Sequence, residues 1–290
     1  MLMTLKCSSY TNDFLFLKIT IPDKECTEIN RKRPETGRFY FKTKLHLTPR
    51  NIQNELDLVE LQLMLYPRKI TDMVSQTILI EKTIDFVKVT LADAEGGHDW
   101  WHIYRVWKTA KHIAEHENSD LLVVELAALL HDIADSKFHD GDEEKGPAIA
   151  SEFLQSMQVE EKVIAHVVKI IANVSFKGGK HEKDFKSIEL DIVQDADRLD
   201  ALGAIGIART FNYGGFKGRA IYNPEIKPDL NLTKEQYKNS TAPTINHFYE
   251  KLLLLKDLMN TQSGRIMAEE RHKFMEIYLD QFYREWEGEK

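Results

Sequence analysis

The sequence contains few cysteines and no long apolar segment. Only two cysteines occur among 290 residues, Cys7 and Cys26, which excludes a cysteine-rich disulfide framework. No run of 18 apolar residues is present, and the apolar segment 14–21 is far shorter than a membrane-spanning helix. Since no secretory signal is recognisable either, these absences predict a cytoplasmic protein without a membrane partner.

The chain also lacks an excess of positive charge. Its 39 Lys and Arg stand against 46 Asp and Glu, a formal net charge of −7. This balance argues against a protein that binds duplex nucleic acid by electrostatic attraction to the phosphates alone. The charge is uneven, because residues 1–50 carry ten basic and five acidic side chains, or +5, which leaves −12 for the remainder.

The front part, residues 1–72, differs in its pattern from the rest of the chain. Segment 14–21 and the alternating segment 41–47 are expected to be strands, and 51–65 a short helix. Nothing in this part carries recognisable chemistry. We interpret 1–72 as an N-terminal extension of unknown role, or the product of a misplaced start, and 73–290 as the functional domain. A docking segment for a partner is the alternative.

From residue 75 onwards the pattern is helical. Ile80, Ile84, Val87 and Leu91 recur at helical spacing, and Asp120 ends a turn that suits the N-cap of the next helix. That helix, 121–133, is apolar nearly all round, which indicates the buried centre of an all-α bundle. Loop 211–244 is long enough to be a lid or a binding loop. Further helices are expected at 146–157, 160–173, 187–210, 245–260 and 266–284.

Three separated helical segments carry candidate metal ligands. His102 lies on one, the pair His131 and Asp132 ends a second, and Asp197 lies on a third. A carboxylate at the end of an apolar helix needs a cation or another partner to offset its burial. Imidazole and carboxylate ligands together suit divalent ions from Mn to Zn.

The ordered set of these segments resembles the HD superfamily of metal-dependent phosphohydrolases. GGHDWWHIYRVW, HDIADSKFHDGDE and DADRLDALGAIGIARTF are most similar to its YedJ/YpgQ-like branch. The resemblance covers roughly residues 75–285 and implies an all-α HD-domain bundle that acts on nucleotide phosphates. It also implies one divalent ion, usually Mn2+, with Mg2+, Ni2+, Co2+, Fe2+ and Zn2+ as alternatives. The implied ligands are His102, His131, Asp132 and Asp197.

Other residues near the motifs are candidates for catalysis and substrate binding. Asp135, four residues beyond His131, is expected either to act as a general acid or base or to be a helix cap. Asp132 and Arg105 complete the predicted catalytic set. His98 and Asp99 precede two tryptophans and suit a helix cap or the mouth of a pocket. The predicted phosphate-binding residues are Arg105, Lys137, Lys177, Lys180 and Arg198.

Several of these cations also suit purely structural roles. Arg198 suits a structural salt bridge equally well, and Lys177 and Lys180 suit a solvated loop. The favoured function is hydrolysis of nucleoside triphosphates to the monophosphate and pyrophosphate. A nucleotidase, a phosphodiesterase and a non-catalytic nucleotide sensor are the alternatives, because the ligands activate water without selecting the bond. The sequence also allows a homodimer.

Overall fold

A computed structural model describes residues 4–11, 14–20, 27–30, 42–43, 67–92, 99–134, 144–174, 185–231, 233, 236 and 240–289. The chain divides into two compact units, Met1–Ile78 and Leu79–Lys290. The predicted role of residues 1–72 stays a prediction. No helix among the described residues combines the length and apolar character that crossing a membrane requires.

The first unit contains a four-stranded antiparallel sheet. Its strands are β1 (Thr4–Thr11), β2 (Phe14–Thr20), β3 (Thr27–Asn30) and β4 (Lys42–Thr43), in the order β1-β2-β3-β4. The strand expected at 14–21 corresponds to β2. Of the segment 41–47 the structure describes residues 42 and 43, and both belong to β4. The helix expected at 51–65 lies outside the described residues.

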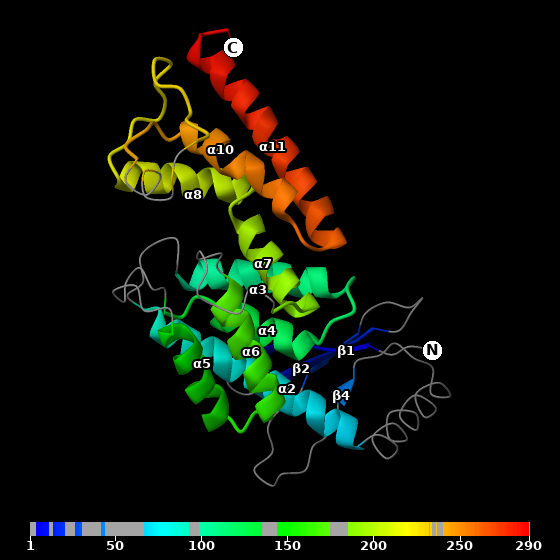
Figure 1. Ribbon diagram of the computed structural model, residues 1–290. Helices are drawn as coiled ribbons and strands as arrows, with labels where there is room; N and C mark the ends of the chain where they lie inside the picture. Colours follow the sequence, from blue (N-terminus) through cyan, green and yellow to red (C-terminus); the bar gives the residue numbers. More distant parts are fainter. Residues whose placement is uncertain are drawn as a thin grey trace. The chain divides into compact units, whose positions relative to one another are not determined.

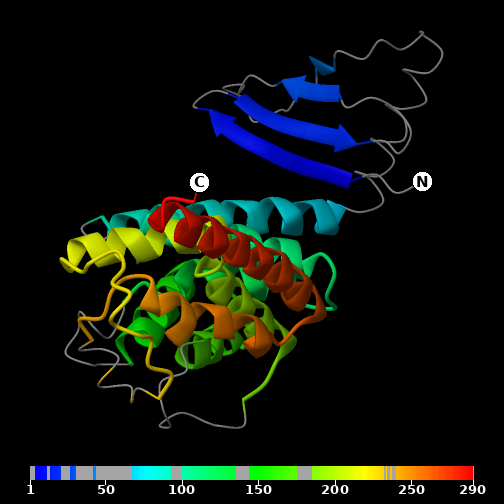
Figure 2. The same cartoon turned by 90° about the horizontal axis from the view of Figure 1, so that it is seen from above.

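The described part of the second unit is helical, which confirms the all-α prediction for the HD region (Figures 1 and 2). Helix α2 (Pro67–Thr90) begins in the first unit and continues into the second. The other described helices are α3 (Trp100–Ala114), α4 (Leu121–Leu130), α5 (Lys145–Ser156), α6 (Glu161–Val174), α7 (Ile188–Asp200), α8 (Gly203–Phe216), α10 (Asn246–Glu250) and α11 (Gln262–Trp286), with a 3-10 helix, η2 (Leu252–Leu258).

Helix α4 lies at the centre of the core, as its apolar sequence predicts. All eight residues from Val123 to Leu130 are buried. Helix α4 packs against α3, α6 and α7. The Asp120 side chain caps its N-terminus by accepting hydrogen bonds from the backbone N–H groups of Leu122 and Val123. A buried α4 therefore holds its C-terminal end, with His131 as the C-cap, against the neighbouring helices.

Two expected helices are interrupted in the structure. The segment 187–210 forms α7 and α8 with a break between them, where Gly203 adopts a φ of +69° that only glycine adopts without strain. The segment 245–260 forms the short α10 followed by the 3-10 helix η2. The first break matters for function, because it brings the side chain of Arg209 on α8 back against Asp200 at the end of α7.

Candidate metal centre

Three of the predicted metal ligands meet in the folded chain. One ligand atom each from His102 on α3, His131 at the end of α4 and Asp197 on α7 lies within 4.8 Å of the other two. Asp197 Oδ1 is 3.5 Å from His102 Nε2 and 3.9 Å from His131 Nε2. Donor atoms about 2.1 Å from a shared ion lie roughly 3–3.5 Å apart, so the cluster needs only a small contraction to hold one.

Hydrogen bonds on the far side of both imidazoles set their tautomers. His102 Nδ1 lies 2.8 Å from Asp200 Oδ2, and His131 Nδ1 lies 2.9 Å from the carbonyl oxygen of Ala128. Carboxylate and carbonyl oxygens only accept hydrogen bonds, so each Nδ1 donates. In the neutral ring the lone pair then lies on Nε2, the nitrogen near Asp197. A hydrogen-bonded partner of this kind orients most histidines that bind metals.

Asp200 joins the cluster to two arginines. Its carboxylate is 4% exposed. It accepts hydrogen bonds from Arg105 Nε at 2.6 Å, from Arg105 Nη2 at 3.0 Å and from Arg209 Nη1 at 2.5 Å. Burial alone would raise the pKa of Asp200, but the hydrogen bonds from His102 and Arg105 and the charge of Arg209 hold that pKa well below its usual range. Asp200 is therefore a buried anion at neutral pH.

The remaining implied ligand, Asp132, follows His131 beyond the end of α4 and is partly buried. It is not in the group of described residues whose ligand atoms lie within 4.8 Å of one another. The cluster of possible metal ligands that the structure describes here is His102, His131 and Asp197, and a contribution from Asp132 stays a prediction.

The structure places several other predicted residues. Asp99 is the N-cap of α3 and accepts a hydrogen bond of 2.9 Å from the backbone N–H of His102. Trp100 packs against the hydrophobic core, whereas Trp101 is 60% exposed. His98, Asp135, Lys137, Lys177 and Lys180 lie outside the described residues.

Arg198 has contacts of a structural kind. Its Nη1 donates to the carbonyl oxygen of Leu258 at 2.7 Å and lies 3.4 Å from Asp195 Oδ1. Adjacent residues of an α-helix point about 100° apart, given 3.6 residues per turn. Arg198 consequently contacts a different neighbour from Asp197, and its contacts favour the salt-bridge alternative.

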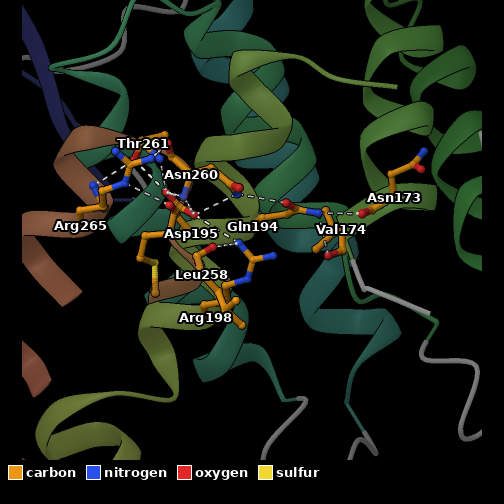
Figure 3. A network of polar contacts seen from close by, with 11 residues as sticks. Asn173, Val174, Gln194, Asp195, Arg198, Leu258, Asn260, Thr261 and Arg265 are labelled. Atoms are coloured by element: carbon orange, nitrogen blue, oxygen red, sulfur yellow. Dashed lines mark hydrogen bonds and ion pairs between the residues drawn. The ribbon is translucent and has the colours of Figure 1, made fainter. Parts of the chain in front are cut away.

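Asp195 ties α7 to the beginning of α11 (Figure 3). This fully buried carboxylate accepts hydrogen bonds from the backbone N–H groups of Asn260 and Thr261, at 2.8 and 2.7 Å, and from the Thr261 hydroxyl at 2.9 Å. The Thr261 hydroxyl in turn caps α11. Helix α7, which carries Asp197 and Asp200, is thereby anchored to α11 as well as to α3 and α8.

Part of the expected binding loop, 211–244, belongs to α8, which continues to Phe216. The described residues beyond it border a cavity of about 310 Å³ between the loop, α10 and α11, lined by Tyr222, Pro224, Ile226, Lys227, Pro228, Asn246, Tyr249 and Tyr283. None of the clustered ligands lines this cavity, and the role of the loop as a lid stays a prediction.

Comparisons with known proteins identify the family. The HD domain model matches residues 100–202, which include all three clustered ligands. Bacillus subtilis YpgQ is 40% identical over 209 residues, 72% of this chain and 94% of YpgQ. A crystal structure of an HD-superfamily hydrolase from Bacillus thuringiensis is 48% identical, with a TM-score of 0.60, and covers 73% of this chain and 98% of its own.

The structure of Bacillus subtilis YpgQ in complex with ADP also matches, with 36% identity and a TM-score of 0.57 over 73% of this chain and 96% of its own. The ordered motifs, the helical bundle and these relatives lead to one conclusion: the chain belongs to the HD superfamily of hydrolases, in the branch that contains YpgQ.

Proposed function

We propose that this chain is a metal-dependent phosphohydrolase of nucleotides that cleaves nucleoside triphosphates to the monophosphate and pyrophosphate. The observation that carries the proposal is the cluster of His102, His131 and Asp197, with both imidazole tautomers set from outside it. Support for a nucleotide substrate comes from YpgQ, whose structure was determined with ADP.

The residues present fit the metal that the family implies. His102, His131 and Asp197 would hold the ion, with Asp132 as the fourth ligand that the resemblance suggests. Two imidazoles and carboxylates suit Mn2+ as well as Mg2+, Ni2+, Co2+, Fe2+ and Zn2+. A bound ion of this kind supplies a Lewis acid that lowers the pKa of a water molecule and neutralises charge on the phosphoryl group.

The protein groups position the reactants and offset their charge. Asp200 holds the His102 ring in place, so His102 does not have to reorient when an ion binds. Arg105 is fixed by two hydrogen bonds to Asp200 through Nε and Nη2, yet its side chain remains 30% exposed. Its Nη1 carries further hydrogens, and we propose that these donate hydrogen bonds to a phosphate oxygen of the substrate. A guanidinium held in this way loses little entropy when it binds a phosphate.

Asp135, Lys137, Lys177 and Lys180 keep their proposed roles on sequence position alone. We propose Asp135 as a general acid or base and the three lysines as phosphate contacts, because in the sequence they follow His131 or precede the segment that carries Asp197. For Arg198 the contacts with Leu258 and Asp195 weigh against phosphate binding.

A substrate panel tests the proposed function. Nucleoside mono-, di- and triphosphates and cyclic nucleotides are offered with Mn2+, Mg2+, Ni2+ or Co2+, and the release of phosphate and pyrophosphate is measured separately. We expect pyrophosphate from triphosphates. Release of phosphate alone would instead indicate a nucleotidase, and binding without turnover would indicate a sensor.

Variants of the cluster connect the activity to the site. His131→Ala and Asp197→Ala should each reduce both the affinity for Mn2+ and turnover by at least 100-fold, and Asp132→Ala should do the same if Asp132 is a ligand. Asp257→Asn, an exposed carboxylate in η2, serves as the matched control. Full activity and full metal loading in His131→Ala would rule out the proposal.

A further inference from the structure

A second group of possible metal ligands lies at the other end of α3. One ligand atom each of His112, Glu115 and His116 lies within 4.8 Å of the other two. The spacing of three and four residues places all three on one face of the helix. His112 Nδ1 is 3.6 Å from Glu115 Oε2, and the rings of His112 and His116 lie edge to face, 5.5 Å apart.

This group is separate from the candidate catalytic centre. His102 lies ten residues before His112 on the same helix, a distance of about 15 Å along the helix axis at 1.5 Å per residue. All three side chains of the second group are exposed, so they reach a cation without a cost of burial. No ligand is shared between the two groups.

The surroundings favour a cation. The group lies at the C-terminal end of α3, where the helix dipole is negative. The nearest lysines are engaged elsewhere: Lys111 pairs with Glu125 at 2.6 Å, and the Lys108 ammonium lies 5.5 Å from the centre of the Trp107 ring. Repulsion by these lysines is thereby reduced.

The ligands also span the end of the helix. His112 belongs to α3, Glu115 is its C-cap, and His116 comes next, with its backbone N–H donating to the carbonyl oxygen of Ile113 at 3.0 Å. An ion that joins all three side chains would close the last turn and hold the start of the connection to α4.

We propose that His112, Glu115 and His116 form a second, exposed site for a borderline divalent cation such as Ni2+ or Zn2+. Two imidazole nitrogens and one carboxylate oxygen are ligands that these ions accept, with water completing the coordination. At a given site of nitrogen and oxygen ligands, Mn2+ binds more weakly than Ni2+ or Zn2+. The site binds its ion independently of the His102 cluster and stabilises the end of α3.

Equilibrium dialysis of the full chain against Ni2+ alone, and separately against Zn2+ alone, tests the proposal. The variant is His112→Gln/His116→Gln, and the matched control is Lys108→Gln, an exposed residue one turn earlier on α3. We expect the variant to bind one equivalent less than the native chain, and Lys108→Gln to bind the native number. Circular dichroism checks that all three proteins are equally helical.

Two further measurements separate this site from the catalytic one. His131→Ala should still bind the equivalent of Ni2+ or Zn2+ that depends on His112 and His116, whether or not it binds the catalytic metal. Glu115→Gln should weaken binding of that equivalent about tenfold, while turnover with Mn2+ stays native. Equal numbers of bound ions in the native chain and in His112→Gln/His116→Gln would overturn the proposal.

Discussion

Asp200 Oδ2 lies 2.8 Å from His102 Nδ1, so a buried carboxylate outside the cluster of possible metal ligands holds the first candidate ligand. The same carboxylate is bound by Arg105 on α3 and Arg209 on α8. Three helices thus meet at one anion. The position of the His102 ring therefore depends on how α7 and α8 pack against α3, the helix that carries His102.

Replacing Asp200 with asparagine should weaken metal binding while leaving every ligand in place. The asparagine amide replaces one acceptor oxygen with an N–H₂ group. It therefore cannot accept all the hydrogen bonds that His102, Arg105 and Arg209 donate to Asp200, and the His102 ring loses its orientation. Loss of such a supporting partner typically costs 10–100-fold in metal affinity, which equilibrium dialysis against Mn2+ measures. Asp257→Asn is the control, and native affinity in Asp200→Asn would show that His102 is held by packing alone.

Substitution of the two arginines near the cluster should affect different properties: stability for Arg198 and substrate binding for Arg105. Arg198→Gln should lower the free energy of unfolding by about 1–2 kcal/mol, because its hydrogen bond to the Leu258 carbonyl is lost, and should leave KM within twofold of native. Arg105→Gln should raise KM for the nucleotide by tenfold or more. Urea unfolding and kinetics with Mn2+ make the comparison. A large rise in KM for Arg198→Gln with native stability would restore Arg198 as a phosphate contact.

Two aspartates on α7 should lose very different amounts of stability when their charge is removed. Asp195→Asn should cost about 2–4 kcal/mol of stability, because the amide cannot accept all the hydrogen bonds that the buried carboxylate receives from Asn260 and Thr261. Asp191→Asn should cost little, since burial already raises the pKa of Asp191 and disfavours its charge. Urea unfolding at pH 7 compares them, and equal losses would contradict the assigned role of Asp195.

Much of the fold was predictable from the sequence because it depends on local patterns. Helical periodicity indicated α2 and α4, and Asp120 marked the beginning of α4. The break before Gly203 was not predicted, because the apolar pattern continues through it and a glycine within such a pattern is often tolerated. Its φ of +69° depends on tertiary packing as well as on sequence.

The candidate site was predictable only where its chemistry appears in an ordered motif. His102, His131 and Asp197 carry the resemblance to the family, and the structure brings them together. Asp200 was missed, although its position three residues after Asp197 places it near the same face of α7. Its importance lies in partners 95 and 98 residues earlier in the sequence, Arg105 and His102. Contacts between residues so far apart in the sequence leave no local pattern from which they could be predicted.

His247 should make stability depend on pH. Burial, together with the nearby charges of Lys251 and Arg219, lowers the pKa of His247 from 6.5 to about 4. Between these values the unfolded chain binds a proton at this histidine and the folded chain does not. The stability present above pH 6.5 is therefore lost as the pH falls toward 4.

The loss should reach about 2 kcal/mol at pH 5, since pH 5 lies about 1.5 units below the unfolded pKa and each unit corresponds to about 1.4 kcal/mol. Urea unfolding at pH 7.5 and pH 5 measures it. His247→Gln should show a smaller fall than the native chain by that amount, because glutamine does not titrate. With EDTA present in all samples, so that no metal is bound, the control His112→Gln, an exposed histidine, should keep the native fall. If His247→Gln also kept it, the pH dependence would have to arise from other groups, and His247 would be protonated as readily in the folded chain as in the unfolded one.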